Sequence, residues 1–369
     1  SSSSAASDVY KRQLLHTIIN SAIVKGQKFM KILAIETSCD ETAAAVAQGR
    51  GNNLEIISNI VSSQIKIHKK YGGVVPEVAA REHVLNIIPV IDQALTTAGL
   101  NKKNAKHELS AIAVTAGPGL ITSLMIGLET AKTLSYVWKL PIISVNHIEG
   151  HLYSNFIDRE RTKFPAIILT VSGGHTQLVL MKNHLSYKTI GETRDDAAGE
   201  AFDKAAQLLG LGYPGGPLIS KQAEKFKGKA SIQLPRPMMD SKNYEFSFSG
   251  LKTALLYMVQ KDKNYKKRIP EYAYAFQEAV VDVLVAKTIR AAKQYKAKTV
   301  MLAGGVAANK RLRERLSEEV KKLKLDFRMP EIKYTTDNAA MIASAGYFKF
   351  KAKKTTPWRK LKVDPNLEL

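Results

Sequence analysis

The same pattern of expected strands and helices occurs twice along this chain. Residues 31–48, KILAIETSCDETAAAVAQ, hold two apolar stretches around a polar turn, and residues 164–183, FPAIILTVSGGHTQLVLMKN, hold two around a glycine turn. After each expected hairpin, buried strands alternate with segments of helical periodicity. Such alternation favours a layered α/β architecture. The repeat predicts two related halves with a cleft between them.

The two halves can be given expected boundaries. We expect an N-terminal lobe made of residues 30–152 together with 346–369, and a C-terminal lobe made of residues 153–345. Residues 1–29 are polar, rich in serine and without an apolar period. We expect this stretch to be a disordered or artefactual extension, and a targeting peptide is the alternative.

Charge is the strongest signal in the composition. The 369 residues include 55 Lys and Arg against 33 Asp and Glu, which gives a formal net charge of +22. This excess favours polyanionic partners, nucleic acid first, and the alternative is a solvated lysine-rich surface. The single cysteine, Cys39, excludes a disulfide within the chain, so we expect a reducing, cytoplasmic location. No apolar run is long enough to cross a bilayer, so we expect no membrane partner.

Three glycine turns stand next to expected strands or helices: SGGH at 172–175, PGG at 214–216 and AGG at 303–305. Glycine lets a backbone approach a ligand closely, and its N–H groups can hold a phosphate or a purine. For any single turn, ordinary turn chemistry is the better interpretation. Three together favour nucleotide binding, although none matches a Walker loop or a GxGxxG motif.

His147 and His151 lie four positions apart in VNHIEGHLYSNF, residues 145–156. On a helix this spacing puts both imidazoles on one face, which suits a metal and equally suits a structural pair. The metalloprotease motif HExxH has its general base directly after the first histidine. Here Glu149 follows two positions later, about 200° round the helix, and would point away from a shared metal. The spacing therefore argues against a protease.

A metal held by this pair needs at least a third ligand. Asp337 is the best candidate, because it comes just before a helix that looks buried. Two histidines and one carboxylate leave coordination positions open and suit Fe(II) or Zn(II). From spacing alone, a helix N-cap is the favoured role of Asp337. Asp40 and Glu41 lie in the polar turn of the first hairpin, where carboxylates are also common without a function.

Nine motifs occur in order along the chain: IETSCDET, AGPGL, NHIEGH, SGGHT, DDAAGEAFDK, YPGGP, FSFSGLKTA, AGGVAAN and TDNAAMIA. Together they closely resemble the TsaD family, the tRNA threonylcarbamoyladenosine transferases once labelled O-sialoglycoprotein endopeptidases. The resemblance runs from Met30 to about Tyr347. The sequences of the DDAAGEAFDK and YPGGP motifs are similar to those of the bacterial or organellar branch. It does not extend to residues 1–29.

The resemblance implies a fold and a set of site residues. The family has the actin/Hsp70/sugar-kinase (ASKHA) fold, a duplicated two-lobe α/β fold with a central cleft. Its metal ligands fall on His147, His151 and Asp337, and its acidic turn falls on Asp40 and Glu41. Its contacts to the adenylate substrate fall on Thr170, Val171, Ser172, Gly173, Gly174, Asp203, Gly216 and Asn309.

The resemblance also implies a reaction. The N6 amine of adenosine 37, in the anticodon stem-loop of tRNAs that read ANN codons, would attack threonylcarbamoyl-AMP bound in the cleft. One divalent metal, Fe(II) first and Zn(II) as the alternative, would act as Lewis acid, and Asp40 or Glu41 would act as base. Bacterial family members act with the proteins TsaB and TsaE. The alternatives to this reading are a metalloprotease and an ATPase or kinase of the same fold.

Overall fold

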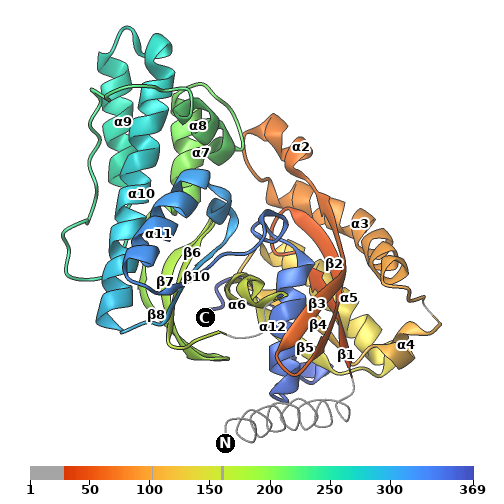
Figure 1. Cartoon of the computed structure of the whole chain (residues 1–369). Helices are drawn as coiled ribbons and strands as arrows, with labels where there is room; N and C mark the ends of the chain where they lie inside the picture. Colours follow the sequence, from red (N-terminus) through yellow and green to blue (C-terminus); the bar gives the residue numbers. More distant parts are fainter. Residues whose placement is uncertain (1–28, 102, 159–161) are drawn as a thin grey trace, which may run out of the picture.

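Two five-stranded sheets carry the structure, a computed structural model that describes residues 29–101, 103–158 and 162–369 (Figure 1). The expected extension at residues 1–29 lies, apart from Phe29, outside the described residues. The first sheet has the order β3-β2-β1-β4-β5 and contains β1 (Met30–Glu36), β2 (Glu41–Arg50), β3 (Asn53–Ser63), β4 (Ala111–Gly117) and β5 (Ile142–Asn146).

The second sheet repeats the topology of the first. It has the order β10-β9-β6-β7-β8 and contains β6 (Ala166–Val171), β7 (Thr176–Asn183), β8 (Ser186–Glu192), β9 (Thr299–Ala303) and β10 (Asp326–Arg328). In both sheets the first three strands form an antiparallel meander, and two further strands then add in parallel on the other side. The duplicated α/β architecture expected from the repeated pattern is therefore confirmed.

The helices connect and cover these sheets. The α-helices are α2 (Ile65–His68), α3 (Pro76–Thr97), α4 (Ala105–Glu108), α5 (Ile121–Trp138), α6 (His147–Tyr153), α7 (Ala198–Leu208), α8 (Gly215–Ala223), α9 (Ser249–Lys261), α10 (Ile269–Gln294), α11 (Lys310–Lys322) and α12 (Ala339–Lys351). Short 3₁₀ turns are η1 (Lys69–Tyr71), η2 (Ser154–Phe156), η3 (Tyr265–Arg268), η4 (Gly305–Ala308), η5 (Ile332–Tyr334) and η6 (Trp358–Lys360). None of the helices in the described ranges combines the length and apolar character that a membrane span requires.

Strand β1 shows how the first sheet is covered on both faces. Successive side chains of a strand point to opposite faces. Leu33 and Ile35 belong to the core that also contains residues of α3 and α5, whereas Ile32 and Ala34 belong to the core that contains α12. All four side chains are fully buried, so β1 reads as a continuous apolar run, as expected for a strand covered on both sides.

Helices α6 and α12 lie between the two sheets (Figure 1). Ile167 and Leu169 of β6 pack beneath helices α7 to α11, whereas Ile168 of the same strand belongs to the core shared with α6, α12 and the first sheet. The helix that carries the histidine pair is therefore held from both sides. This central position brings side chains from both lobes to one place.

Residues beyond α12 pack back onto the first sheet. Thr356 forms an antiparallel bridge with Ile142 at the start of β5. Trp358 contacts Tyr136 of α5 edge to face, with ring centroids 5.4 Å apart. Leu361 is only 3% exposed. The basic segment that follows α12 is thus part of the packed structure.

Candidate metal centre

Asn146 sets the start of the histidine helix. Its side-chain oxygen accepts hydrogen bonds from the backbone N–H groups of Ile148, at 2.8 Å, and Glu149, at 3.2 Å. These N–H groups have no partner within the helix, so Asn146 is the N-cap and α6 begins at His147. The rings of His147 and His151 then lie on one face with centroids 4.7 Å apart.

Asp337 completes a three-residue cluster with the two histidines. Its Oδ1 atom lies 3.2 Å from Nε2 of His151 and 3.5 Å from Nε2 of His147. One ligand atom from each residue lies within 4.8 Å of the other two. The N-cap of α12 is Asn338, whose side chain accepts from the N–H of Met341 at 3.1 Å. The N-cap role that spacing favoured for Asp337 is therefore wrong, because Asn338 caps the helix and leaves the Asp337 carboxylate facing the histidines.

The donor set fits a divalent metal. Neither ring nitrogen of the buried His151 has an aligned hydrogen-bond partner within the described chain, even though Nε2 lies close to Asp337. An unsatisfied buried polar group costs about 1–3 kcal/mol, and a metal ion bound to Nε2 would satisfy one of the two. Two imidazole nitrogens and one carboxylate are a ligand set found at Fe(II) and Zn(II) sites. These three residues form the candidate metal centre.

Glu36 and Ser38 contact Nδ1 of His147, the ring nitrogen on the side away from Asp337. Nδ1 of His147 lies 3.0 Å from Oγ of Ser38 and 3.3 Å from Oε2 of Glu36. Glu36 is fully buried and also accepts a hydrogen bond from Thr115 Oγ1 at 2.5 Å. Partners of this kind fix the ring orientation and tautomer of a metal-binding histidine, here with Nε2 turned toward Asp337.

Opposite charges decide the protonation of this network. Burial alone would lower the pKa of His147, but the negative charges of Asp337 and Glu36 outweigh it and raise that pKa well above its usual range. Burial alone would raise the pKa of Glu36, but the charge of His147 outweighs it and lowers that pKa. A metal that binds Nε2 of His147 must displace a proton, so metal affinity should fall as the pH is lowered.

Glu149 points away from the candidate metal centre. Its side chain is 1% exposed and pairs with Nζ of Lys349 in α12 at 2.7 Å. The hydroxyl of Tyr187, from β8, donates to its other oxygen. The carboxylate therefore ties α6 to α12 and to the second sheet. This confirms the expectation that Glu149 leaves the histidine face, and it removes the general base that a zinc protease of the HExxH type would need.

The first glycine turn lies at the end of β6, after Thr170 and Val171. The carbonyl groups of Ser172 and Gly173 accept from the backbone of α7 at 3.2 and 3.1 Å. A Cβ atom on Gly199 would lie 2.5 Å from the Ser172 oxygen, so only glycine permits this close approach. On the other side of the turn, a Cβ atom on Gly173 or Gly174 would meet nothing within 4 Å. The turn is thus held from one side and open on the other.

Asp203 and Asn309 have protein partners in the second lobe. Oδ1 of Asp203 accepts from the N–H of Gly215 at 2.6 Å, which fixes the PGG turn, and burial raises the pKa of Asp203. A Cβ atom on Gly216 would meet nothing within 4 Å. The side-chain oxygen of Asn309 caps α11 through the N–H of Leu312 at 2.9 Å, and its amide nitrogen bonds with neighbouring side chains of α8 and α10.

The acidic turn of the first lobe, with Asp40 and Glu41, lies near Asp337 of the metal cluster. Burial raises the pKa of Glu41 to about 10, and the charges of Asp337 and Asp40 add to this rise. Burial also raises the pKa of Tyr213, with contributions from Asp40 and Asp203. The pKa of Tyr213 therefore responds to a carboxylate of the first lobe and to one of the second. The acidic turn of the first lobe is thus close enough to Asp337 and to Asp203 for their charges to act on the same groups.

Several residues in this region were not singled out from the sequence. Burial lowers the pKa of His175 to about 4, and the charge of His147 adds to this, so His175 is neutral near pH 7. His175 follows the first glycine turn, and Tyr213 precedes the PGG turn. Their positions beside the glycine turns were the sequence signal that could have identified them. Glu36 and Ser38 carried the same signal as part of the acidic turn, but a sequence does not show which turn residue meets a histidine.

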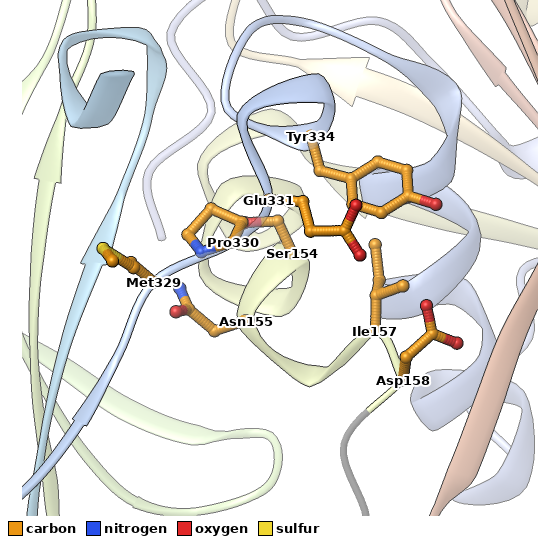
Figure 2. Close-up of a pocket in the computed structure, with 8 residues that line it drawn as sticks. All are labelled: Ser154, Asn155, Ile157, Asp158, Met329, Pro330, Glu331 and Tyr334. Carbon is orange, nitrogen blue, oxygen red and sulfur yellow. The ribbon is translucent and has the colours of Figure 1, made fainter. Parts of the chain in front are cut away.

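Segments next to the metal ligands in the sequence also line a cavity. Residues just after α6 and residues just before Asp337 line a cavity of about 130 Å³ (Figure 2). Its lining residues are Ser154, Asn155, Ile157, Asp158, Met329, Pro330, Glu331 and Tyr334. None of the three candidate metal ligands lines this cavity.

We expect His151→Ala to lose the bound metal and to stay folded, because it removes one of three ligands and only one side chain of a large core. Metal content per protein, measured by plasma mass spectrometry beside a circular dichroism spectrum, checks this. Glu149→Gln is the matched contrast on the same helix. It should unfold at a lower temperature, because Lys349 loses its buried partner, and should keep its metal. Full metal occupancy in His151→Ala would contradict the assignment.

Comparison with known proteins identifies the family of the chain. A family profile described as "TsaD: tRNA N6-adenosine threonylcarbamoyltransferase" matches residues 55–344. A tRNA N6-adenosine threonylcarbamoyltransferase of Dehalococcoides mccartyi is 52% identical over 321 residues, which cover 87% of this chain and 94% of that protein. Enzymes of the same name from Desulfitobacterium hafniense and Bacillus subtilis are 49% and 51% identical, over 93% and 88% of this chain and 98% and 92% of their own lengths.

Among solved structures, HypF of T. kodakarensis has a similar fold, with a TM-score of 0.58 at 13% identity. The match covers 88% of this chain and 48% of HypF, so this chain spans about half of that protein's length. At this identity the likeness concerns the fold alone, and it agrees with the ASKHA architecture. The profile and the close relatives decide the family: this chain belongs to the TsaD family of tRNA N6-adenosine threonylcarbamoyltransferases.

Proposed function

We propose that the chain transfers the threonylcarbamoyl group from threonylcarbamoyl-AMP to N6 of adenosine 37 in tRNAs that read ANN codons. The observation that carries this proposal is the candidate metal centre, whose Asp337 acts electrostatically on the acidic turn, in a chain whose second lobe has open glycine turns. A metal held there by His147, His151 and Asp337 would supply a Lewis acid and a template for the adenylate. Fe(II) is the proposed ion and Zn(II) the alternative.

The second lobe is proposed to bind the adenylate. Thr170, Val171 and Ser172 lead into the turn at Gly173 and Gly174, whose open side leaves room for a phosphate against backbone N–H groups. Asp203, Gly216 and Asn309 are proposed to contact the nucleoside from the PGG turn and from the start of α11. The hydrogen bond from the Gly215 N–H to Asp203 supports this, because it fixes the turn before any ligand binds.

Of the two acidic candidates, we propose Asp40 as the base. The pKa of Glu41 is raised to about 10, mainly by burial, so its carboxyl holds a proton near neutral pH and cannot take another. In the proposed step, the adenosine nitrogen forms a bond to the carbamoyl carbon, and the bond from that carbon to the phosphate oxygen breaks. The amine proton passes to Asp40, and AMP leaves with the electron pair.

The charge of the chain supports the tRNA partner. A net charge of +22 favours contact with phosphate groups, which dominate the affinity of proteins for nucleic acids. Anticodon-loop bases can be splayed out of the stack and presented to a cleft. A cytoplasmic location and the lobe boundaries at residues 152 and 346 remain predictions.

We also propose that TsaB and TsaE act with this chain, and that TsaB docks on an apolar face of α3 and α5. These helices pack against each other, and their outer sides expose Val84, Leu85 and Ile88, and Ile121 and Met125, each by 47–68%. We call these five residues the α3/α5 face. Grouped apolar side chains of this kind mark protein interaction sites more often than free surface.

Reconstitution tests the reaction. Purified protein, TsaB, TsaE, threonylcarbamoyl-AMP and unmodified tRNA should yield the modified nucleoside, scored by mass spectrometry of the digested tRNA. Asp40→Asn should lower the rate about 10²–10⁴-fold, the usual contribution of a general base, whereas Glu41→Gln should retain most of it. Equal losses in the two variants would assign the base role elsewhere. Peptide cleavage by the metal-loaded protein, with tRNA left unmodified, would favour the protease.

The partner proposal has its own test. Leu85→Glu puts a charge on the most exposed residue of the α3/α5 face and should weaken TsaB binding by at least about tenfold, which corresponds to about 1.4 kcal/mol. Titration calorimetry measures this. The matched control is Tyr257→Glu on α9 of the second lobe, where the side chain is 58% exposed and binding should not change. Unchanged affinity in Leu85→Glu would rule out this face.

A further inference from the structure

Residues Asp364–Glu368, which we call the strap, lie across the turn after β4 and the N-cap of α6. The N–H of Asp364 donates to the carbonyl of Ala116 at 2.8 Å, and the N–H of Gly119 donates to the carbonyl of Pro365 at 3.2 Å. The side-chain amide of Asn146 donates to the carbonyls of Leu367, at 2.9 Å, and Glu368, at 3.1 Å. Figure 1 shows this end of the chain beside α6.

The fit between the strap and the turn is close. A Cβ atom on Gly117 would lie 1.8 Å from the carbonyl oxygen of Asp364 and 3.0 Å from Cβ of Leu367. Gly117 has a φ angle of 156°, within the range that favours glycine. No side chain therefore separates the strap from the turn, and the two backbones are in direct contact.

Two short paths lead from the strap to His147. In the first, the turn held by the strap contacts Ser38: the N–H of Leu120 donates to the Ser38 carbonyl at 2.8 Å, and Oγ of Ser38 lies 3.0 Å from Nδ1 of His147. In the second, Asn146 holds the strap with its amide nitrogen and caps α6 with its amide oxygen. The same side chain thus fixes both the strap and the residue before His147.

The chain before the strap has anchors of its own. The N–H of Thr356 donates to the carbonyl of Ile142 at 2.9 Å, and Leu361 is packed into the core below α3 and α5. Loss of the strap contacts therefore removes support from the metal centre without releasing the whole segment after α12.

We propose that the strap is a positioning element of the candidate metal centre, and that Asn146 is the residue through which it acts. The strap holds Asn146 and the turn that contacts Ser38, and so fixes the orientation in which His147 presents Nε2 beside Asp337. The proposal rests on the metal centre proposed above. Groups that orient a metal ligand typically contribute 10–100-fold to metal affinity, and this is the loss expected here.

Two variants test the strap from opposite sides. Asn146→Ser keeps a hydroxyl that can cap α6 but removes the amide that holds Leu367 and Glu368. A chain that stops after Val363 lacks the strap and keeps Asn146. Each should bind Fe(II) or Zn(II), measured by competition with a chromophoric chelator, about 10–100-fold more weakly than the wild type. Glu368→Gln changes only an exposed side chain and keeps the carbonyl, so its affinity should equal that of the wild type.

A control separates positioning from general stability. Leu316→Ala creates a cavity under α11, in a core cluster of the second lobe that contains no strap residue, and should lower the melting temperature without changing the metal affinity. If Asn146→Ser and the shortened chain bind metal as tightly as the wild type, or lose only melting temperature, the strap proposal fails and the metal centre stands. If the wild type binds no metal, the metal centre itself fails.

Discussion

The hydrogen-bonded and ionic chain from Glu36 through His147 to Asp337 joins the parts of this molecule on which the site depends. Each of these residues comes from a different element: the end of β1, the start of α6 and the loop before α12. A buried carboxylate or imidazolium is stable only when it is paired and hydrogen-bonded, so the three segments must meet in one arrangement. The position of these three residues also fixes the end of β1 and the start of α6, next to the acidic turn.

Much of this could be predicted from the sequence, because periodicity and motif order are local signals. The duplicated sheets follow from the two hairpins and the alternation after them, and the histidine pair follows from its spacing. Asp337 was harder, since a carboxylate before a helix usually caps it, and only the structure shows that Asn338 does so. The roles of Glu36, Ser38 and His175 depend on which turns meet in space, and single-sequence patterns carry no information about that.

The position of the Glu149 side chain explains how this chain can contain part of a protease-like motif without the corresponding chemistry. A shift of one position along a helix turns a side chain by about 100°, enough to move it from the histidine face to the opposite packing surface. There Glu149 meets Lys349 and Tyr187, which come from α12 and from the second sheet. The residue that would activate water in a protease is instead a buried link between the lobes.

The spread of the metal centre along the chain also orders its assembly during synthesis. Glu36 and His147 are separated by 111 residues, and Asn146 and Leu367 by 221. A ribosome therefore completes the first sheet and the histidine helix long before it makes Asp337. Such distant contacts form late and slowly. A nascent first lobe holds two histidines without their carboxylate, so an ion that needs all three ligands would bind only after Asp337 has been made.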